Sequence, residues 1–291
     1  MAASAETQDG EGPGVRLQRL MADRGVASRR ECERLIEEGK VTVNKRRVNR
    51  LPVFVNPDTD DIRVNGAPLP QPARPAYVIL HKPPRTLAIT RDDPAFGETR
   101  VTISDLVNHP AKARLFPVGR LEYHASGLVL LTTDGDLAHR LTHPRFGVPR
   151  VYEALVKRRL TEADLAEIER AFHASAKSGP RGRLDAPAGA VVALQLIKHD
   201  DDRSLIEIVL REGPNRQVAD ILARLGCPVK KLRRTGIGPL RLKRVAVGEW
   251  RELTRAELAA LKRAAKGAPV AKAEGSATRR RGPKPEPKER A

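Results

Sequence analysis

The segment VGRLEYHASGLVLLTTDG, residues 118–135, places one carboxylate, Glu122, between two apolar runs. Glu122 is the only acidic residue between Asp105 and Asp134. A lone carboxylate in a loop is either a solvated surface acid or the reactive group of an enzyme. Hydrolysis of a glycosidic bond generally uses two carboxylates that flank the sugar. Because this loop offers Glu122 alone, the sequence argues against a glycoside or nucleoside hydrolase.

The overall charge points to a polyanionic partner. The chain has 54 lysine and arginine residues against 36 acidic residues, which gives a formal net charge of +18. A basic protein that neutralises phosphates gains free energy from counterion release, so nucleic acid is the favoured partner. The alternative is that the charge reflects only a basic tail.

The two cysteines predict neither a metal site nor a disulfide. Cys32 and Cys227 are far apart, and neither has a second cysteine or a histidine at ligand spacing. We therefore expect buried thiols, no bound metal and a cytoplasmic location. No apolar run approaches the roughly 18 residues of a membrane span, and the first residues lack the apolar core of a signal peptide.

Composition divides the chain into five parts. Two segments are rich in small, polar or charged residues, cannot offset the entropy of ordering, and are predicted to be disordered. Between them the sequence predicts a small module, a proline-rich linker and a larger unit. In chain order the parts are a disordered N-terminus (1–14), the small module (15–66), the linker (67–76), the larger unit (77–263) and a basic disordered tail (264–291).

The small module begins with two short helices. Leu17, Leu20 and Met21 share one helical face, and Ser28 with Glu31 forms the pattern of a capping box. Apolar alternation then predicts a strand, and the Asn65-Gly66 dipeptide predicts a hairpin turn.

Two arginines occupy the first turn of the second helix. Arg29 and Arg30 oppose the helix dipole there, at a cost of about 0.3–1 kcal/mol each when exposed. The same helix end presents free N–H groups that favour phosphate. We therefore expect a phosphate backbone to dock at this end. The alternative is two solvated arginines with a small tolerated penalty.

The larger unit alternates irregularly between strands and helices, which predicts an α+β fold with a mixed, mainly antiparallel sheet and flanking helices. A short helix over Leu137 and Leu141 is capped by Asp134 or Asp136. Periodicity predicts longer helices at 161–172, 215–226 and 254–265. The predicted strands are YVILHKPP, LFPVGRL, GLVLLTTDG, RVYEALV, AVVALQLI, SLIEIVL and part of VKKLRRTGIGPLRL.

The small module resembles the S4 RNA-binding domain through V-A-S-R-R-E-C-E-R-L-I and G-K-V-T-V-N. In that family two helices and the following turn cradle structured RNA. Contacts to the RNA backbone position the protein but do not read bases. The residues that the resemblance implies as RNA contacts are Arg16, Arg29, Arg30, Lys40 and Lys45.

The larger unit resembles the pseudouridine synthases that modify ribosomal RNA, in the branch that carries an S4 domain in front. Three stretches carry the resemblance. His81–Pro83 matches the family's opening strand end, and the Glu122 loop matches G-R-L-D…G-L-L-L-L-T-x-D-G. Residues 212–218, EGPNRQV, match its C-terminal signature. The implied reaction isomerises uridine to pseudouridine in ribosomal RNA and needs no metal and no redox cofactor.

The resemblance also implies the site residues. Glu122 takes the place of the family's catalytic aspartate, and Arg120 that of the arginine beside it, which would keep the carboxylate charged. Tyr152 matches the tyrosine that stacks on the target base. Arg216 matches the basic residue that pairs with the carboxylate or with phosphate, and Arg150 precedes the tyrosine. The alternatives are a core tyrosine at Tyr152 and surface salt bridges at Arg120 and Arg216.

Three positions depart from the family pattern. Glu122 adds one methylene, Arg150 stands where lysine is commoner, and Ala219-Asp220 stand where arginines are expected. A displacement of about 1 Å can cost on the order of 10²-fold in rate. A second hypothesis is therefore a catalytically impaired paralogue that binds ribosomal RNA during ribosome assembly. The basic C-terminal extension favours large-subunit RNA, and we expect a monomer.

Overall fold

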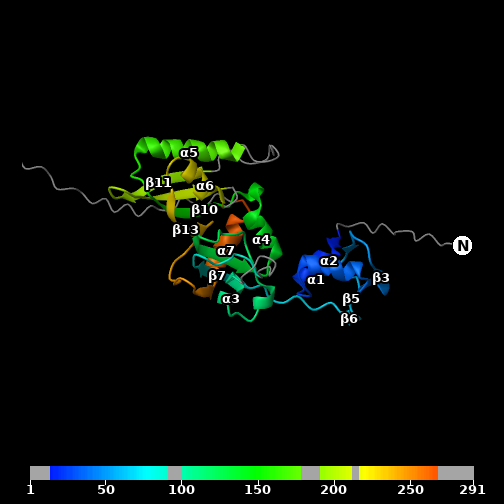
Figure 1. The fold of residues 1–291 in the computed structure, drawn as a ribbon. Coiled ribbons are helices and arrows are strands. Elements are labelled where there is room, and N and C mark those ends of the chain that lie inside the picture. Colours follow the sequence, from blue (N-terminus) through cyan, green and yellow to red (C-terminus); the bar gives the residue numbers. More distant parts are fainter. Residues whose placement is uncertain (1–13, 91–99, 178–190, 212–215, 268–291) are drawn as a thin grey trace, which may run out of the picture.

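The computed structural model describes residues 14–90, 100–177, 191–211 and 216–267. These residues form a small N-terminal part of two helices and short strands, followed by a larger part built on one nine-stranded sheet (Figure 1). The predicted disordered N-terminus, except Gly14, and most of the predicted basic tail lie outside the described residues.

The N-terminal part packs two helices, α1 (Leu17–Asp23) and α2 (Arg29–Glu37), over a small apolar core. The predicted helical face is confirmed, because Leu17 and Met21 are fully buried. The short strands pair in two antiparallel sheets: β1 (Val15–Arg16) with β4 (Phe54–Val55), and β3 (Arg46–Val48), β2 (Val41–Val43), β5 (Ile62–Val64) and β6 (Ala67–Pro68) in that order.

The capping box predicted for α2 is only half formed. The Ser28 side chain accepts a hydrogen bond from the Glu31 N–H at 3.3 Å, as expected of an N-cap. The Glu31 carboxylate, however, pairs with the Arg34 guanidinium at 2.6 Å, one helical turn further on. A charged partner at this spacing holds the carboxylate away from the helix start.

The predicted hairpin turn is confirmed. Asn65 and Gly66 both adopt positive φ, 50° and 81°, between β5 and β6. Such a pair of left-handed residues is typical of a tight turn whose twist matches that of the flanking strands.

The large sheet is mixed and mainly antiparallel, as predicted. Its order is β11-β12-β10-β13-β9-β7-β15, and β13 with β9 is the one parallel pair among the described strands. The strands are β7 (Tyr77–Lys82), β8 (Phe116–Pro117), β9 (Ser126–Thr132), β10 (Arg150–Val156), β11 (Val191–His199), β12 (Ser204–Leu210), β13 (Val229–Ile237), β14 (Leu240–Arg241) and β15 (Trp250–Glu252).

Helices cover both faces of this sheet (Figure 1). Side chains of β7 alternate between two cores, with Val78 and Leu80 in one and Ile79 in the other. The first core includes residues of α5 (Glu162–Lys177) and α6 (Arg216–Arg224), and the second includes residues of α4 (Gly135–Thr142) and α7 (Arg255–Ala264). Shorter helices are α3 (Ile103–Leu106), η2 (Lys112–Arg114) and η3 (Pro144–Phe146).

Three details of the larger part decide between, or correct, the expectations from the sequence. Asp134, and not Asp136, caps α4, since its side chain accepts from the Leu137 N–H at 2.9 Å. The strand expected at LFPVGRL shrinks to the two residues of β8, because Gly119 turns the chain at φ 75°. The predicted tail begins too early, because α7 runs through Ala264 and Ala265 is buried.

Gly127 lets β9 and β13 approach each other closely. It has φ 116°, and a Cβ atom there would lie 2.2 Å from the Arg234 carbonyl oxygen and 2.6 Å from the Arg234 nitrogen. Both neighbours are backbone atoms that cannot rotate away. Any side chain at this position would therefore separate the only parallel pair of the described sheet.

We expect Gly127→Ala to lower the free energy of unfolding by at least about 3 kcal/mol, because backbone overlap adds to the strain of positive φ. Gly66→Ala is the matched control. It also has positive φ but meets nothing within 4 Å, so its cost should stay near 1–2 kcal/mol. Urea unfolding measures both, and equal losses would contradict the close approach.

Candidate active site

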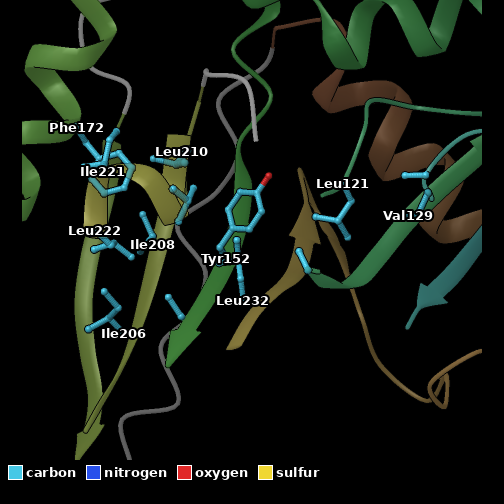
Figure 2. Close-up of a cluster of buried hydrophobic side chains, with 14 of the residues drawn as sticks. Leu121, Val129, Tyr152, Phe172, Ile206, Ile208, Leu210, Ile221, Leu222 and Leu232 are labelled. Atoms are coloured by element: carbon cyan, nitrogen blue, oxygen red, sulfur yellow. The ribbon is translucent and has the colours of Figure 1, made fainter. Parts of the chain in front are cut away.

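Glu122 is half-buried on the loop between β8 and β9. The two residues that anchor this loop, Leu121 and Ala125, are buried in the same core as Tyr152. In Figure 2 Leu121 lies on one side of the Tyr152 ring, and Ile208 and Leu210 lie on the other. Apolar contacts thus hold the chain on both sides of the carboxylate.

Lys82, the last residue of β7, contacts the loop from one end. It is fully buried, and its ammonium donates to the carbonyl oxygens of Pro83 at 2.9 Å, Thr86 at 2.9 Å and Tyr123 at 3.3 Å. Burial, with a smaller contribution from the nearby charge of Arg234, lowers the pKa of Lys82 to about 8. The bond to Tyr123 fixes the backbone directly after Glu122.

Arg234 of β13 contacts the loop from the other end. It too is fully buried, and its guanidinium donates to the carbonyl oxygens of Leu128 at 2.8 Å and Arg120 at 3.1 Å. The remaining nitrogen, Nη2, has no acceptor among the described residues. Arg234 therefore holds the backbone two residues before Glu122.

These two buried cations are the site residues that sequence reasoning missed. Taking a charge out of water costs several kcal/mol unless hydrogen bonds compensate for it. Here two of the compensating acceptors, the carbonyls of Arg120 and Tyr123, flank Glu122, so part of the compensation depends on the position of the loop. Lys82 belongs to the HKP stretch, so the sequence could have pointed to it. Nothing in the sequence distinguishes Arg234 from the other arginines of its basic run.

Tyr152 lies in the middle of the sheet with 1% of its surface exposed. Its neighbour across the ladder in β13 is Arg234, which in turn pairs with Gly127 of β9. Three strands thus bring Tyr152 next to the loop of Glu122. The burial is what a core tyrosine would show, and contact of its ring with a substrate base stays a prediction.

The other predicted substrate-binding residues lie in different environments. The Arg120 side chain is exposed, although its carbonyl is held by Arg234. Arg150, the first residue of β10, is half-buried and donates to the Leu141 carbonyl at 3.5 Å. Arg216 is the first residue of α6, as predicted, but its side chain lies outside the described part, so its pairing with Glu122 stays a prediction. Asp220, at a departure from the family pattern, is exposed.

The predicted RNA contacts of the N-terminal part, Arg16, Arg29, Arg30, Lys40 and Lys45, are all exposed. Lys40 is paired with the Glu38 carboxylate at 2.6 Å, and the Arg16 guanidinium lies 6.0 Å from the Phe54 ring centroid. The strand after Lys45, β3, also exposes Arg46 and Arg47, which widen the basic edge. Sequence reasoning missed these two arginines because their strand could not be oriented in advance.

The N-terminal part contacts the larger part beside α4. Arg19 of α1 pairs with Asp136, and the Arg29 guanidinium lies 3.2 Å from where a Cβ atom on Gly135 would be. Asp23 lies in the same contact, where burial raises the pKa of its carboxyl against the opposing effect of Arg29. Arg29 therefore lies at the edge of the contact between the two parts and also faces solvent.

Both cysteines are free and buried, as predicted, and burial raises the pKa of Cys32 to about 11. Across the described ranges, no three histidine, cysteine or acidic residues gather in a group that could hold a metal ion. None of the helices described is both long and apolar enough to cross a membrane.

Comparison with known proteins shows which family the chain belongs to. The sequence model for RNA pseudouridylate synthases matches residues 76–224, and that for the S4 domain matches residues 15–59. The chain belongs to the RNA pseudouridylate synthase family. This confirms both resemblances, and it makes the Glu122 loop part of a pseudouridine synthase fold.

Curated relatives match nearly the whole of this synthase. An uncharacterized RNA pseudouridine synthase of Aquifex aeolicus is 37% identical over 247 residues, covering 85% of this chain and 93% of the relative. Ribosomal large subunit pseudouridine synthase B of Bacillus subtilis is 36% identical over 249 residues, 85% of this chain and 95% of the relative. A crystal structure of a pseudouridylate synthase is 26% identical, with a TM-score of 0.55, over 85% of this chain and 99% of that one.

Arg234→Met is expected to lower kcat for pseudouridine formation by about 10²-fold with little change in KM. The reason is that a loop released by about 1 Å misplaces its carboxylate without removing RNA contacts. The matched control is Arg233→Met, next in the chain, where the side chain is exposed and pairs with Glu153 at 2.9 Å. Single-turnover kinetics measures both, and an unchanged kcat for Arg234→Met would refute the positioning role.

Lys82 should give the stability of the protein a specific pH dependence. Its pKa is about 8 when folded against 10.5 when unfolded, so the unfolded chain binds more protons between these values. The free energy of unfolding of the wild type should therefore rise relative to Lys82→Met as pH increases from 8 to 10.5, by on the order of 3 kcal/mol. Urea unfolding across this range tests it, and parallel curves for the two proteins would contradict it.

Proposed function

We propose that this protein isomerises a specific uridine of large-subunit ribosomal RNA to pseudouridine, with Glu122 as the catalytic carboxylate. The observation that carries the proposal is the position of Glu122. It stands on a loop whose backbone is held before and after it by the buried cations Arg234 and Lys82. These bonds fix the backbone on both sides of Glu122 and so set the position of its carboxylate.

The reaction has three steps. The bond between the sugar and the base nitrogen must break, the base must rotate, and a carbon of the base must join the sugar. That carbon loses a proton and the released nitrogen gains one, so substrate and product are isomers. In this proposal Glu122 acts at the anomeric carbon, as nucleophile or as base toward the sugar, and the buried cations preorganise it.

The remaining predicted residues supply binding in the same scheme. Tyr152 forms the wall on which the detached base rests, while Arg120, Arg150 and Arg216 contact the nucleotide or its phosphate. The target base must leave its stack to reach Glu122, so the uridine is unpaired or flipped. The S4 domain holds the surrounding RNA through its exposed basic residues.

The substrate assignment rests on the relatives and on charge. The B. subtilis relative is named a large-subunit enzyme, and the net charge of +18 suits ribosomal RNA or a pre-ribosomal particle. We further propose that the protein acts as a monomer in the cytoplasm. The alternative of an assembly factor without isomerase activity rests only on departures from the family pattern, chiefly glutamate in place of aspartate at position 122.

The deciding experiment maps pseudouridine in transcribed ribosomal RNA after incubation with wild type, Glu122→Asp, Glu122→Gln and Glu122→Ala. We expect product from wild type and a loss of at least about 10³-fold in Glu122→Gln and Glu122→Ala, because both lack the carboxylate. RNA affinity should stay within about threefold in all variants, since the neutral substitutions leave the basic surfaces intact.

Two outcomes would contradict this scheme. If only Glu122→Asp made product, the wild type would be an impaired synthase. If wild type and Glu122→Ala made equal product, Glu122 would have no part in the mechanism.

A further inference from the structure

The end of α4 and the following turn of η3 bring together two histidines, two arginines and a phenylalanine. We call His139, Arg140, His143, Arg145 and Phe146 the α4–η3 cluster. The ring centroids of the two histidines lie 5.0 Å apart, and each lies 6.2 Å from the Phe146 centroid. The guanidinium carbons lie 4.5 Å (Arg145) and 6.0 Å (Arg140) from the same centroid.

The cluster is cationic and has no neutralising partner among the described residues. His139, Arg140 and Arg145 are exposed, and no described carboxylate lies within 4.0 Å of either guanidinium. An arginine that stacks on a ring keeps the N–H groups in its plane free to bind phosphate. His143 accepts from the Arg145 N–H through Nδ1 at 3.2 Å, which leaves Nε2 as the donor of its ring.

The cluster borders the loop that carries Glu122. Arg150 donates to the carbonyl of Leu141 near the end of α4. A Cβ atom on Gly119, three residues before Glu122, would lie 3.6 Å from Thr142 and 3.9 Å from the Arg150 guanidinium. On its other side Gly147 faces Arg211, with 3.8 Å from its Cβ position to the arginine side chain. The end of α4, which carries part of the cluster, therefore lies beside Gly119 and Arg150 at the edge of the candidate active site.

We propose that the α4–η3 cluster binds unpaired nucleotides of the substrate RNA next to the target uridine. This inference rests on the proposed function, which makes RNA the substrate. Arg140 and Arg145 take the phosphates, and the rings of Phe146 and the histidines offer a stacking surface for a base. The partner is a single-stranded stretch because a stacking surface requires a base face that pairing does not occupy. Holding the neighbours of a flipped nucleotide keeps the backbone in place while the base is turned out.

The first test removes the two phosphate contacts. We expect the double variant Arg140→Ala plus Arg145→Ala to raise KM for the rRNA transcript about tenfold or more, with kcat within about threefold. The plot of log affinity against log salt should become less steep by about 1.4, since each phosphate contact on a single strand contributes about 0.7. Filter binding over a range of salt and steady-state kinetics give both values.

The matched control removes the same charge from the opposite face of the sheet. Arg159→Ala plus Arg170→Ala changes one arginine on α5 and one just before it, both exposed. α5 packs on one core of the sheet and α4 on the other (Figure 1). The control should leave KM and the salt dependence at wild-type values. Equal losses in the two double variants would show a general charge effect and overturn the proposal.

The second test measures the contribution of the Phe146 ring alone. Phe146→Leu keeps an apolar side chain against the core but removes the stacking surface. We expect its affinity for a single-stranded rRNA oligonucleotide to fall about fivefold or more, and its affinity for the same sequence in a full duplex to stay unchanged. Equal affinity of wild type and variant for the single strand would overturn the stacking role.

The proposed function can fail separately. If the wild type forms no pseudouridine, that function is lost, but both binding tests still give an answer. If the wild type is active and Arg140→Ala plus Arg145→Ala keeps wild-type KM and salt dependence, the cluster is a surface feature with no role in RNA binding.

Discussion

The buried guanidinium of Arg234 joins β13 to two neighbouring segments that lie more than 100 positions earlier in the sequence. It belongs to β13, donates to the Leu128 carbonyl of β9, and donates to the Arg120 carbonyl at the start of the catalytic loop. Hydrogen bonds of a charged donor are stronger than neutral ones, at about 1.5–3 kcal/mol each. This side chain ties β13 to β9 and to the backbone before Glu122, while Gly127 lets the backbones of β9 and β13 approach each other. Without it the loop would keep its apolar anchors and the bonds that the Tyr123 carbonyl accepts from Lys82 and from the Arg85 N–H.

Cationic side chains serve two distinct purposes in this fold. The buried ones, Arg234 and Lys82, bind backbone carbonyls and fix the geometry of the site. The exposed ones, on the S4 domain and around α4, face solvent and are available to phosphate. Exposure alone does not make a cation available, because Lys40 is already paired with Glu38. A basic composition therefore overstates the RNA-binding surface unless the internal arginines and the paired lysines are set aside.

Much of the architecture could be predicted from local patterns. Apolar periodicity located α4, α5 and α6, and the Asn65-Gly66 pair located a hairpin, because these signals lie within a few residues of each other. Arg234 could not be found in this way. Arg233 and Arg234 are adjacent in the same basic run, yet one is exposed and the other fully buried. Which of them points inward depends on the pairing of β13 with β9, a contact between residues more than 100 positions apart. The capping box of α2 is only half formed for a local reason, since Arg34 competes for the Glu31 carboxylate that the sequence assigns to the helix start.

Burial gives Lys82 a low pKa and at the same time keeps reagents away from its amine. With a pKa lowered to about 8, the Lys82 amine is unprotonated far more often in mildly alkaline buffer than that of an ordinary lysine. Because the side chain is fully buried under the loop, an amine-reactive reagent reaches it only when the loop opens. Acylation of Lys82 therefore reports opening of the structure around it, and not the reactivity that its lowered pKa alone would suggest.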